Sequence, residues 1–415
     1  MKKLYSSALC LIGLAPLFNA SAQCPSGRYT TAQFGVDTAK NIQYGSNIST
    51  QDGTTTIDLF MDIYTPKNDT MSKRPVVVMA HGGSFIGGTK TDGDITYMCT
   101  ELASRGYVCA SISYRLQTAA ALAVPATAKE KMVKEVIAAA QDGKAAVRFF
   151  RKDAATSNSY KVDADQIFFG GTSAGAVLGI HMAYLDSTDA MDSSWRAWAV
   201  QMGGFEGNSG NPGYPATVKA IVSYAGAIGD VNWIHGDDVP FADWHSQNDA
   251  TVPDSTGYPL GLPYLPTLTG GRLMHRRADA VGTYNFYHQY PGSSHPPFIS
   301  GTSIDPTIIA EMRDETVTFL YSRVLCNPAY ISGIEEINAA AIQLSPNPAT
   351  SQITISADKA IRSIDVIDQL GRTIKTVDVQ LNNSTVISVR DLTAGTYFAK
   401  VNGVANTIVK RFIIN

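Results

Sequence analysis

The stretch from about Ile42 to Cys326 alternates short apolar runs with longer helical stretches, and this alternation constrains the fold most strongly. The apolar runs have no polar alternation, which is typical of strands buried on both faces of a parallel sheet. Between them, apolar residues in Lys129–Arg151 recur at helical spacing, although Gly143 weakens that helix locally. The order predicts an α/β fold with a doubly wound, mostly parallel sheet. The predicted strands are Pro75–Ala80, Tyr107–Tyr114, Gln166–Phe169 and Val218–Ala225.

The sequence changes character after Cys326. We expect a catalytic domain over residues 23–328, a linker over 329–341 and a small β-sandwich over 342–415, because the last segment contains only short strand-like runs separated by turns. This C-terminal segment has no histidine and no catalytic constellation. It is therefore interpreted as a carrier, and a carbohydrate-binding β-sandwich is the alternative.

The N-terminus resembles an export signal. Lys2 and Lys3 precede the apolar stretch Ala8–Phe18, and Ala20-Ser21-Ala22 is a small-residue cleavage site, so residues 1–22 are predicted to be a signal peptide. The stretch is too short to span a bilayer, and a buried N-terminal helix is the alternative. A lipid anchor on the following cysteine is disfavoured by the bulky Gln23 before it. The formal net charge of −3 provides no basic field, so nucleic acid is not expected as a partner.

Export permits disulfides, and four cysteines remain after the signal. We expect Cys99–Cys109, which would link a helix to the next strand, and Cys24–Cys326, which would link the two ends of the catalytic domain. The alternative is that Cys109, inside an apolar strand, is a free buried thiol. No cysteine spacing indicates a metal site.

A candidate nucleophile lies in Gly171-Thr172-Ser173-Ala174-Gly175, between the strand Gln166–Phe169 and an expected helix from Ala176. A serine hydroxyl reacts only when it is exposed beside a base, and a strained strand–turn–helix corner achieves this exposure. The flanking glycines avoid Cβ clashes with the neighbouring elements. The pattern alone is common, and its position between strand and helix makes it informative.

A second glycine-rich turn, His81-Gly82-Gly83-Ser84-Phe85, follows the strand Pro75–Ala80. Acyl transfer places negative charge on the former carbonyl oxygen, and backbone N–H groups in such a turn can stabilise that charge. The turn is therefore interpreted as an oxyanion loop that His81 supports structurally; a simple strand-ending turn is the alternative.

The base is expected after the last strand, and the acid before it in the chain. Tyr284–Tyr290 is expected to be that strand, so His295 in the following turn is the candidate base. Val239–His245 is expected to be the preceding strand, and Asp249 in its exit loop is the candidate acid. Asp254 and Asp243 are weaker candidate acids, Asp237 and Asp238 are assigned to a solvated turn, and His181 and His288 are assigned structural roles.

These residues resemble the carboxylesterase and lipase branch of the α/β-hydrolases over roughly Ile42–Tyr321. The resemblance also includes Tyr114-Arg115-Leu116, Gln141-Asp142-Gly143 and Asp249-Ala250-Thr251-Val252-Pro253. It implies an oxyanion hole formed by the backbone N–H groups of Gly83, Ser84 and Ala174. Ser84 replaces the family's usual third glycine, and His245-Ser246-Gln247-Asn248-Asp249 departs from its usual His-Gly-Thr-x-Asp.

The C-terminal segment resembles the type A sorting domain of the type IX secretion system. The matching pieces are Ser345-Pro346-Asn347-Pro348-Ala349, Gly371, Leu392, Gly395-Thr396-Tyr397 and Val409–Ile414. The resemblance implies passage through the periplasm and release at the cell surface or into the medium, with the outer-membrane secretion machinery as a partner.

The sequence therefore predicts a secreted hydrolase of small-molecule or polymeric carboxylic esters that forms an acyl-enzyme and needs no metal or organic cofactor. A polysaccharide-deacetylating, feruloyl or polyester esterase, or a serine peptidase, would use the same triad. A non-catalytic surface-binding protein is the remaining alternative. Phe85, with Trp195, Trp198, Trp233 and Trp244, is a candidate wall of the substrate pocket, although core packing is the commoner role of aromatics. The loop Gly203–Tyr214 is expected to border the site.

Overall fold

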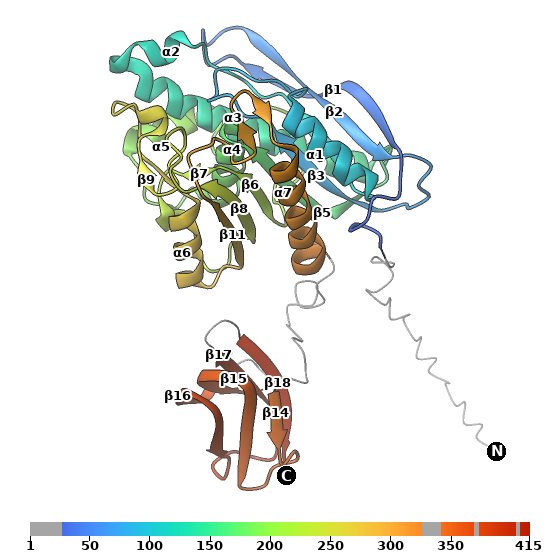
Figure 1. The fold of residues 1–415 in the computed structure, drawn as a ribbon, viewed down its shortest axis with the longest axis vertical. Helices are drawn as coiled ribbons and strands as arrows, with labels where there is room; N and C mark the ends of the chain where they lie inside the picture. Colours follow the sequence, from blue (N-terminus) through green and yellow to red (C-terminus); the bar gives the residue numbers. More distant parts are fainter. Residues whose placement is uncertain (1–26, 326–341, 369–372, 404–406) are drawn as a thin grey trace, which may run out of the picture.

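The computed structural model describes residues 27–325, 342–368, 373–403 and 407–415, and the predicted signal peptide and linker lie outside them. The first of these ranges is built on an eight-stranded sheet (Figure 1). Its order is β1-β2-β4-β3-β5-β6-β8-β11, in which β1, β2 and β4 pair antiparallel and all later pairs are parallel. These strands are β1 (Val36–Ile48), β2 (Thr56–Pro66), β3 (Arg74–Ala80), β4 (Val108–Ile112), β5 (Val162–Thr172), β6 (Ile221–Tyr224), β8 (Phe241–Ser246) and β11 (Asn285–Tyr290). The predicted mostly parallel α/β sheet is confirmed.

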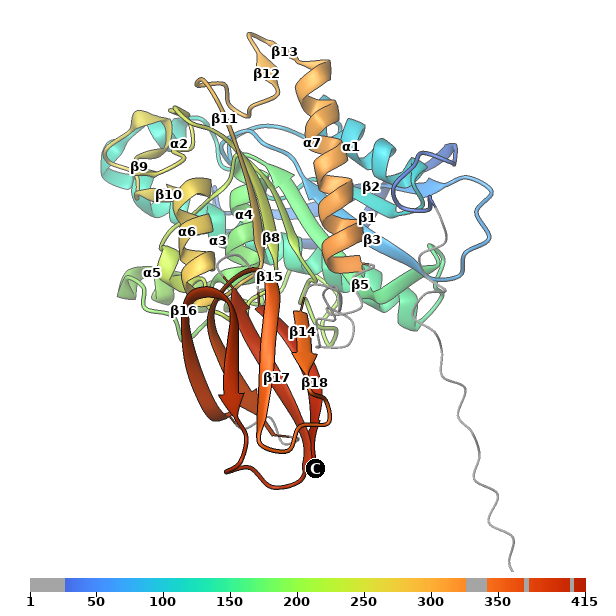
Figure 2. The ribbon, with the colours of Figure 1, turned by 60° about the horizontal axis from the view of Figure 1, so that its bottom comes forward.

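Helices bury both faces of this sheet. All seven residues of β3 are buried, with Val76 and Val78 in one apolar cluster and Val77 and Met79 in another, as the alternation of a strand dictates. The first cluster includes residues of α3, α4 and α6, and the second includes residues of α1 and α7. Figure 2 shows α1 and α7 side by side. The helices are α1 (Gly93–Ser104), α2 (Ala120–Ala123), α3 (Pro125–Ala155), α4 (Ala174–Tyr184), α5 (Ser193–Gln201), α6 (Gly271–Val281) and α7 (Pro306–Thr318).

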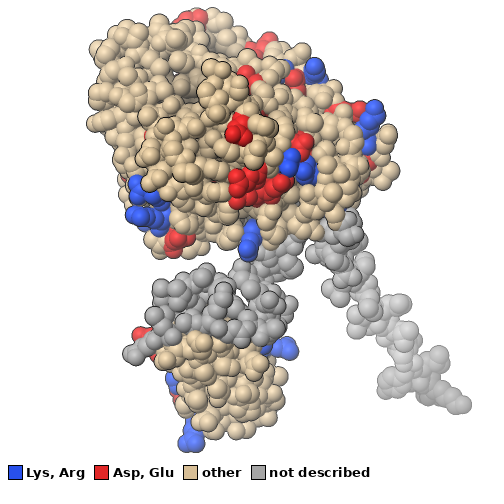
Figure 3. All heavy atoms as spheres, viewed as in Figure 1, with Lys and Arg blue, Asp and Glu red and all other residues tan. Residues whose placement is uncertain are grey.

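Short elements complete the domain at the ends of the sheet. They are β7 (Ala227–Ile228), η2 (Val231–Trp233), β9 (Thr256–Gly257), η3 (Pro259–Gly261), β10 (Leu268–Gly270), β12 (Ile299–Ser300), β13 (Ser303–Ile304) and η4 (Phe319–Leu325). On the face shown in Figure 3, acidic and basic side chains are interspersed and most of the surface carries neither. In the part of the chain that the structure describes, no helix is both long and apolar enough to cross a bilayer.

The C-terminal segment folds as a small antiparallel β domain with an apolar core of its own. Its long central strand β15 pairs with β14, β16 and β17, and β17 pairs with β18. Ile353, Ile364 and Phe412 are fully buried in its core. The strands are β14 (Ile342–Ser345), β15 (Gln352–Ile367), β16 (Thr373–Ser388), β17 (Gly395–Gly403) and β18 (Thr407–Ile414).

One buried ion pair connects two of the quoted sequence motifs. Arg115 follows β4 and Asp142 lies in α3, and their side chains form hydrogen bonds of 2.8–3.1 Å with 3% and 0% exposure. The Arg115 guanidinium also donates to the carbonyls of Ile48 and Ala138, and Ser209 donates to Asp142 at 2.5 Å. This network ties the β1 end, α3 and the Gly203–Tyr214 loop together.

The cysteine pair was predicted to be a disulfide, but the structure contains two buried thiols there. Cys99 in α1 and Cys109 in β4 are both free, with their Sγ atoms 3.0 Å apart. That separation is about 1 Å longer than a disulfide bond. Cys99 and Cys109 are therefore in contact, as predicted, and the disulfide bond between them stays a prediction. Cys24 and Cys326 lie outside the described residues.

Candidate active site

The candidate nucleophile occupies a strained corner between β5 and α4. Ser173 has φ 54° and ψ −117°, a conformation that non-glycine residues rarely adopt, and its N–H donates to the Tyr224 carbonyl at 2.8 Å. A Cβ on Gly171 would lie 2.4 Å from the backbone of Gly175, and one on Gly175 would lie 2.1 Å from the Ala80 carbonyl oxygen. The two glycines are therefore required for α4 to pack this closely behind Ser173.

His295 and Asp249 lie beside this serine in a continuous hydrogen-bonded chain. His295 Nε2 is 2.6 Å from Ser173 Oγ, and His295 Nδ1 is 2.5 Å from Asp249 Oδ2. The three residues follow the carboxyl ends of β5, β8 and β11, which meet at one edge of the parallel sheet. The sequence placed each residue in the loop where the structure has it.

The other carboxylate oxygen of Asp249 is held by its own loop. Asp249 Oδ1 accepts hydrogen bonds from the N–H groups of Thr251 and Val252 at 2.8 and 3.0 Å. These two bonds fix the orientation of the carboxylate that contacts His295. The weaker candidate Asp254 has other partners, because Tyr287, Gln289 and the Arg272 backbone N–H all donate to it.

The loop after β3 turns back beside Ser173. Gly83, Ser84 and Phe85 all have positive φ, at 107°, 55° and 59°. A Cβ on Gly83 would lie 2.2 Å from the Gly87 carbonyl oxygen, so only glycine fits the turn. Among the described residues, no acceptor pairs with the N–H groups of Gly83, Ser84 or Ala174. The arrangement leaves three donors free beside the serine.

His81 supports this loop, as the sequence indicated. Its ring stacks on Tyr114 with centroids 4.4 Å apart, its Nδ1 is 2.7 Å from the Gly82 carbonyl oxygen, and Tyr114 donates to the His81 carbonyl. Burial lowers the pKa of His81, because a buried imidazolium loses its hydration. His81 is therefore a neutral structural residue.

His181 and His288 also have the structural roles predicted for them. His181 in α4 contacts the Val177 carbonyl and accepts from the Gly229 N–H, and burial lowers its pKa to about 4. His288 Nδ1 lies 2.8 Å from a carboxylate oxygen of Glu315 on α7. Neither lies within hydrogen-bonding distance of Ser173.

Two hollows meet at Ser173. Counting space open to solvent, the larger has about 1230 Å³ and the smaller about 710 Å³. The larger is walled almost entirely by apolar side chains from α3, α4, α5 and the Pro259–Leu268 segment. Phe85, Trp195, Trp233 and Phe205 of the Gly203–Tyr214 loop line it, as the sequence suggested. The Trp244 suggestion is wrong, because this side chain is fully buried in the core and donates to Glu315, and Trp198 lies outside both hollows.

The smaller hollow lies on the histidine side of Ser173. His295 lines it, together with Asp92, Asp94, Thr172 and the β12–β13 hairpin. Burial raises the pKa of Asp94. Sequence reasoning missed both aspartates, since α1 was not assigned to the site.

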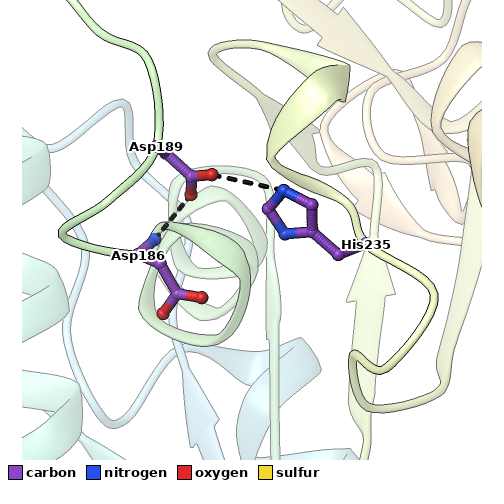
Figure 4. Close-up of side chains that lie close together, drawn as sticks. All are labelled: Asp186, Asp189 and His235. Carbon is purple, nitrogen blue, oxygen red and sulfur yellow. Dashed lines mark hydrogen bonds and ion pairs between the residues drawn. The ribbon is translucent and has the colours of Figure 1, made fainter.

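A separate polar cluster lies between the α4–α5 connection and the segment after η2. Figure 4 shows the Asp189 carboxylate between the Asp186 backbone N–H and the His235 ring, at 2.7 and 3.3 Å. These three residues have the atom types of a metal site. None of the three lines either hollow at Ser173. Their contacts join two segments of the larger hollow's wall.

Comparisons with known proteins agree with this architecture. Residues 61–229 match the sequence model of the BD-FAE family, and residues 343–415 match that of the secretion system C-terminal sorting domain. No curated protein matches the chain.

The chain is similar to three structures of Thermogutta terrifontis esterase 2. The propionate-bound structure is 18% identical with a TM-score of 0.47, covering 68% of this chain and 93% of that one. The butyrate-bound structure is 17% identical with a TM-score of 0.46, covering 66% and 93%. The paraoxon-phosphorylated structure is 18% identical with a TM-score of 0.47, covering 71% and 96%.

The sheet, its helices and the family match define the class: this is a hydrolase with an α/β-hydrolase domain. More particularly, the chain is an esterase in which residues 61–229 match the BD-FAE family, and this part is followed by a type IX secretion sorting domain that directs export to the cell surface or medium. The predictions of an esterase, of the C-terminal sorting domain and of export are confirmed.

Proposed function

We propose that this protein is a secreted serine esterase in which Ser173, His295 and Asp249 form the catalytic triad. The observation that carries the proposal is the unbroken chain of contacts from the Asp249 carboxylate through both His295 nitrogens to the Ser173 hydroxyl. The strained backbone of Ser173 supports it, because strain of this kind concentrates at functional sites.

The reaction has two steps. His295 Nε2 takes the Ser173 proton as Oγ attacks the ester carbonyl, and the N–H groups of Gly83, Ser84 and Ala174 stabilise the resulting oxyanion. The tetrahedral intermediate expels the alcohol, which receives the proton from His295 and leaves an acyl group on Oγ. Water, deprotonated by His295, then releases the carboxylic acid. Asp249 accepts a hydrogen bond from the Nδ1–H group throughout, which holds the ring and stabilises its charged form.

The position of His295 supports a proposal for which part of the ester each hollow binds. A leaving alcohol must reach His295 Nε2, and His295 lines the smaller hollow and not the larger one. The alcohol part of the ester therefore occupies the hollow with Asp92 and Asp94. The acyl group occupies the large apolar hollow, which favours a bulky or aromatic acyl group over acetyl.

Trp195 supports a more specific proposal for the acyl group. Its indole Nε1 is buried, has no hydrogen-bond partner among the described residues, and belongs to a side chain that lines the apolar hollow. A buried N–H without an acceptor is costly. Because Nε1 is closed to the hollow as the indole lies here, an aromatic acyl group with an oxygen substituent, such as a feruloyl group, would supply that acceptor once the indole turns toward it. Within the BD-FAE family we therefore favour feruloyl over acetyl esters.

Replacing Ser173 by alanine tests the proposed nucleophile. Hydrolysis of p-nitrophenyl and feruloyl esters should fall by about 10⁴–10⁶-fold in Ser173→Ala, with the thermal unfolding midpoint close to that of the wild type. Unchanged turnover in the folded variant would refute the assignment.

Trp195→Phe should lower kcat/KM for feruloyl esters and leave unsubstituted cinnamoyl esters unaffected. An equal effect on both would refute the hydrogen-bonding role of Trp195.

A further inference from the structure

A second imidazole is buried directly behind the candidate acid. His245 in β8 is fully buried and takes no part in the proposed reaction. Its Nδ1 is 3.2 Å from Asp243 Oδ2, and its Nε2 is 2.8 Å from the Val252 carbonyl oxygen and 3.6 Å from Asp249 Oδ2. Both ring nitrogens face only acceptors. A neutral imidazole has one N–H, so both contacts are satisfied only when His245 is an imidazolium.

The charged groups around His245 fix this state. Asp243 faces it from its own strand and accepts from the Ser223 hydroxyl on β6 and from the Gly226 N–H. The first residue of α6, Gly271, leaves room for the Asp243 carboxylate, since a Cβ there would lie 2.0 Å from Asp243 Oδ2.

From β11, Gln289 is the register partner of His245, and its side chain donates to Asp254, whose charge is paired with Arg272. The two unpaired charges that reach His245 are therefore Asp243 and Asp249. Burial alone would lower the pKa of His245, but the hydrogen bond and charge of Asp243, the Val252 carbonyl and the charge of Asp249 outweigh it and raise the pKa to about 9.

We propose that His245 is a positioning residue of the triad, an imidazole that is protonated at neutral pH and holds the same Asp249 oxygen that contacts His295. The inference rests on the proposed roles of Asp249 and His295. Asp249 Oδ2 contacts both imidazoles, at 2.5 Å from His295 Nδ1 and 3.6 Å from His245 Nε2. Val252 fixes the arrangement because its N–H donates to Asp249 Oδ1 while its carbonyl accepts from His245. The positive charge of His245 attracts the Asp249 carboxylate and opposes a second positive charge on the catalytic base.

His245→Gln removes the charge while keeping hydrogen-bond donors. The charge lies about 6 Å from His295 Nδ1 through Asp249 Oδ2, so its loss should raise the acidic limb of the kcat/KM pH profile by about 0.5–2 pH units. The shift should be about 0.5 pH units if Asp243 takes up a proton when the His245 charge is lost, because one negative charge near His295 then disappears as well. At pH values below the acidic limb, kcat should fall by the corresponding factor of about 3–100, and KM should change little. His288→Gln, on the neighbouring strand, is the matched control and should leave the profile unchanged.

A merely structural role for His245 predicts a different result. His245→Gln would then unfold at a lower temperature but keep the wild-type pH profile, and that outcome overturns the inference. Because Ser173→Ala tests the nucleophile separately, an inactive Ser173→Ala with an unshifted His245→Gln profile would reject only the role of His245. An active Ser173→Ala would reject the proposed function itself.

A measurement on the wild-type protein covers the case in which His245→Gln does not fold. Nitrogen-15 NMR of histidine-labelled protein should show one imidazole with both nitrogens protonated up to about pH 8, and Asp243→Asn should abolish that state and shift the acidic limb upward. The absence of any doubly protonated imidazole at about pH 8 would overturn the inference.

Discussion

Gly175→Ala is predicted to damage the enzyme although helix propensity favours the change. Alanine in a helix is favoured over glycine by about 1 kcal/mol, and Gly175 lies in the first turn of α4. In the structure, however, an added Cβ would lie 2.1 Å from the Ala80 carbonyl oxygen, 2.5 Å from its carbon and 2.6 Å from the His81 carbonyl oxygen. All three atoms are backbone, so no side-chain rotation relieves the clash.

The size of the clash sets the expected effect. Real Cβ atoms essentially never approach closer than 3.0 Å, so α4 and the end of β3 must separate by about 0.9 Å. That movement displaces Ser173 from the Gly83–Ser84 loop. A misplacement of about 1 Å at reacting groups costs about 100-fold in rate, or about 2.7 kcal/mol of transition-state stabilisation. The overpacking should also destabilise the fold by about 1–3 kcal/mol.

The assay compares steady-state hydrolysis of a short p-nitrophenyl ester with thermal unfolding for Gly175→Ala and a control. Gly35→Ala is the control, because a Cβ there meets only the Lys67 side chain at 3.6 Å. We expect kcat/KM to fall about 100-fold in Gly175→Ala and to stay at the wild-type value in Gly35→Ala. A folded Gly175→Ala enzyme with wild-type kinetics or a raised unfolding temperature would refute the steric reasoning.

Three further predictions concern stability and redox state. Arg115→Met should destabilise the fold by about 3–5 kcal/mol in urea unfolding, because it leaves Asp142 charged and buried; a loss below about 1 kcal/mol would contradict this. The folded pKa of His245, about 9, exceeds the unfolded value of about 6.5. The stability that His245 adds to the fold is therefore fully present below about pH 6.5 and is lost as the pH rises through about 9. Urea midpoints of His245→Gln with the same pH dependence as the wild type would contradict this prediction. Cys99 and Cys109 are free thiols in contact in this structure, but export takes the chain into an oxidising compartment. Alkylation and mass spectrometry of the secreted protein should therefore find the two cysteines joined, and two alkylated thiols would contradict this.

The position of the candidate active site was predictable because its residues are marked by local sequence signals. Ser173 is marked by glycines two residues away on each side, and His295 and Asp249 follow apolar strands in the order that the fold demands. The boundaries of helices were predicted less accurately than the positions of these residues. The helix after the nucleophile begins at Ala174 and not at Ala176, since the turn is tighter than the apolar pattern indicated.

The remaining features depend on contacts between distant segments. The role of His245 follows from its distances to Asp243, Val252 and Asp249, which no periodicity encodes. Trp244 and Trp233 have the same residue type, yet one is in the core and the other lines the hollow. The aspartates of the smaller hollow come from α1, which the sequence did not connect with the site.

The most direct measurement of the central claim is the site of covalent labelling by a fluorophosphonate. Only a serine activated by a neighbouring base reacts rapidly with this reagent, and peptide mass spectrometry locates the adduct. The account predicts one adduct per chain on the peptide that contains Ser173, and strongly reduced labelling in His295→Ala. Labelling of another serine, or none in the active wild-type enzyme, would contradict the account.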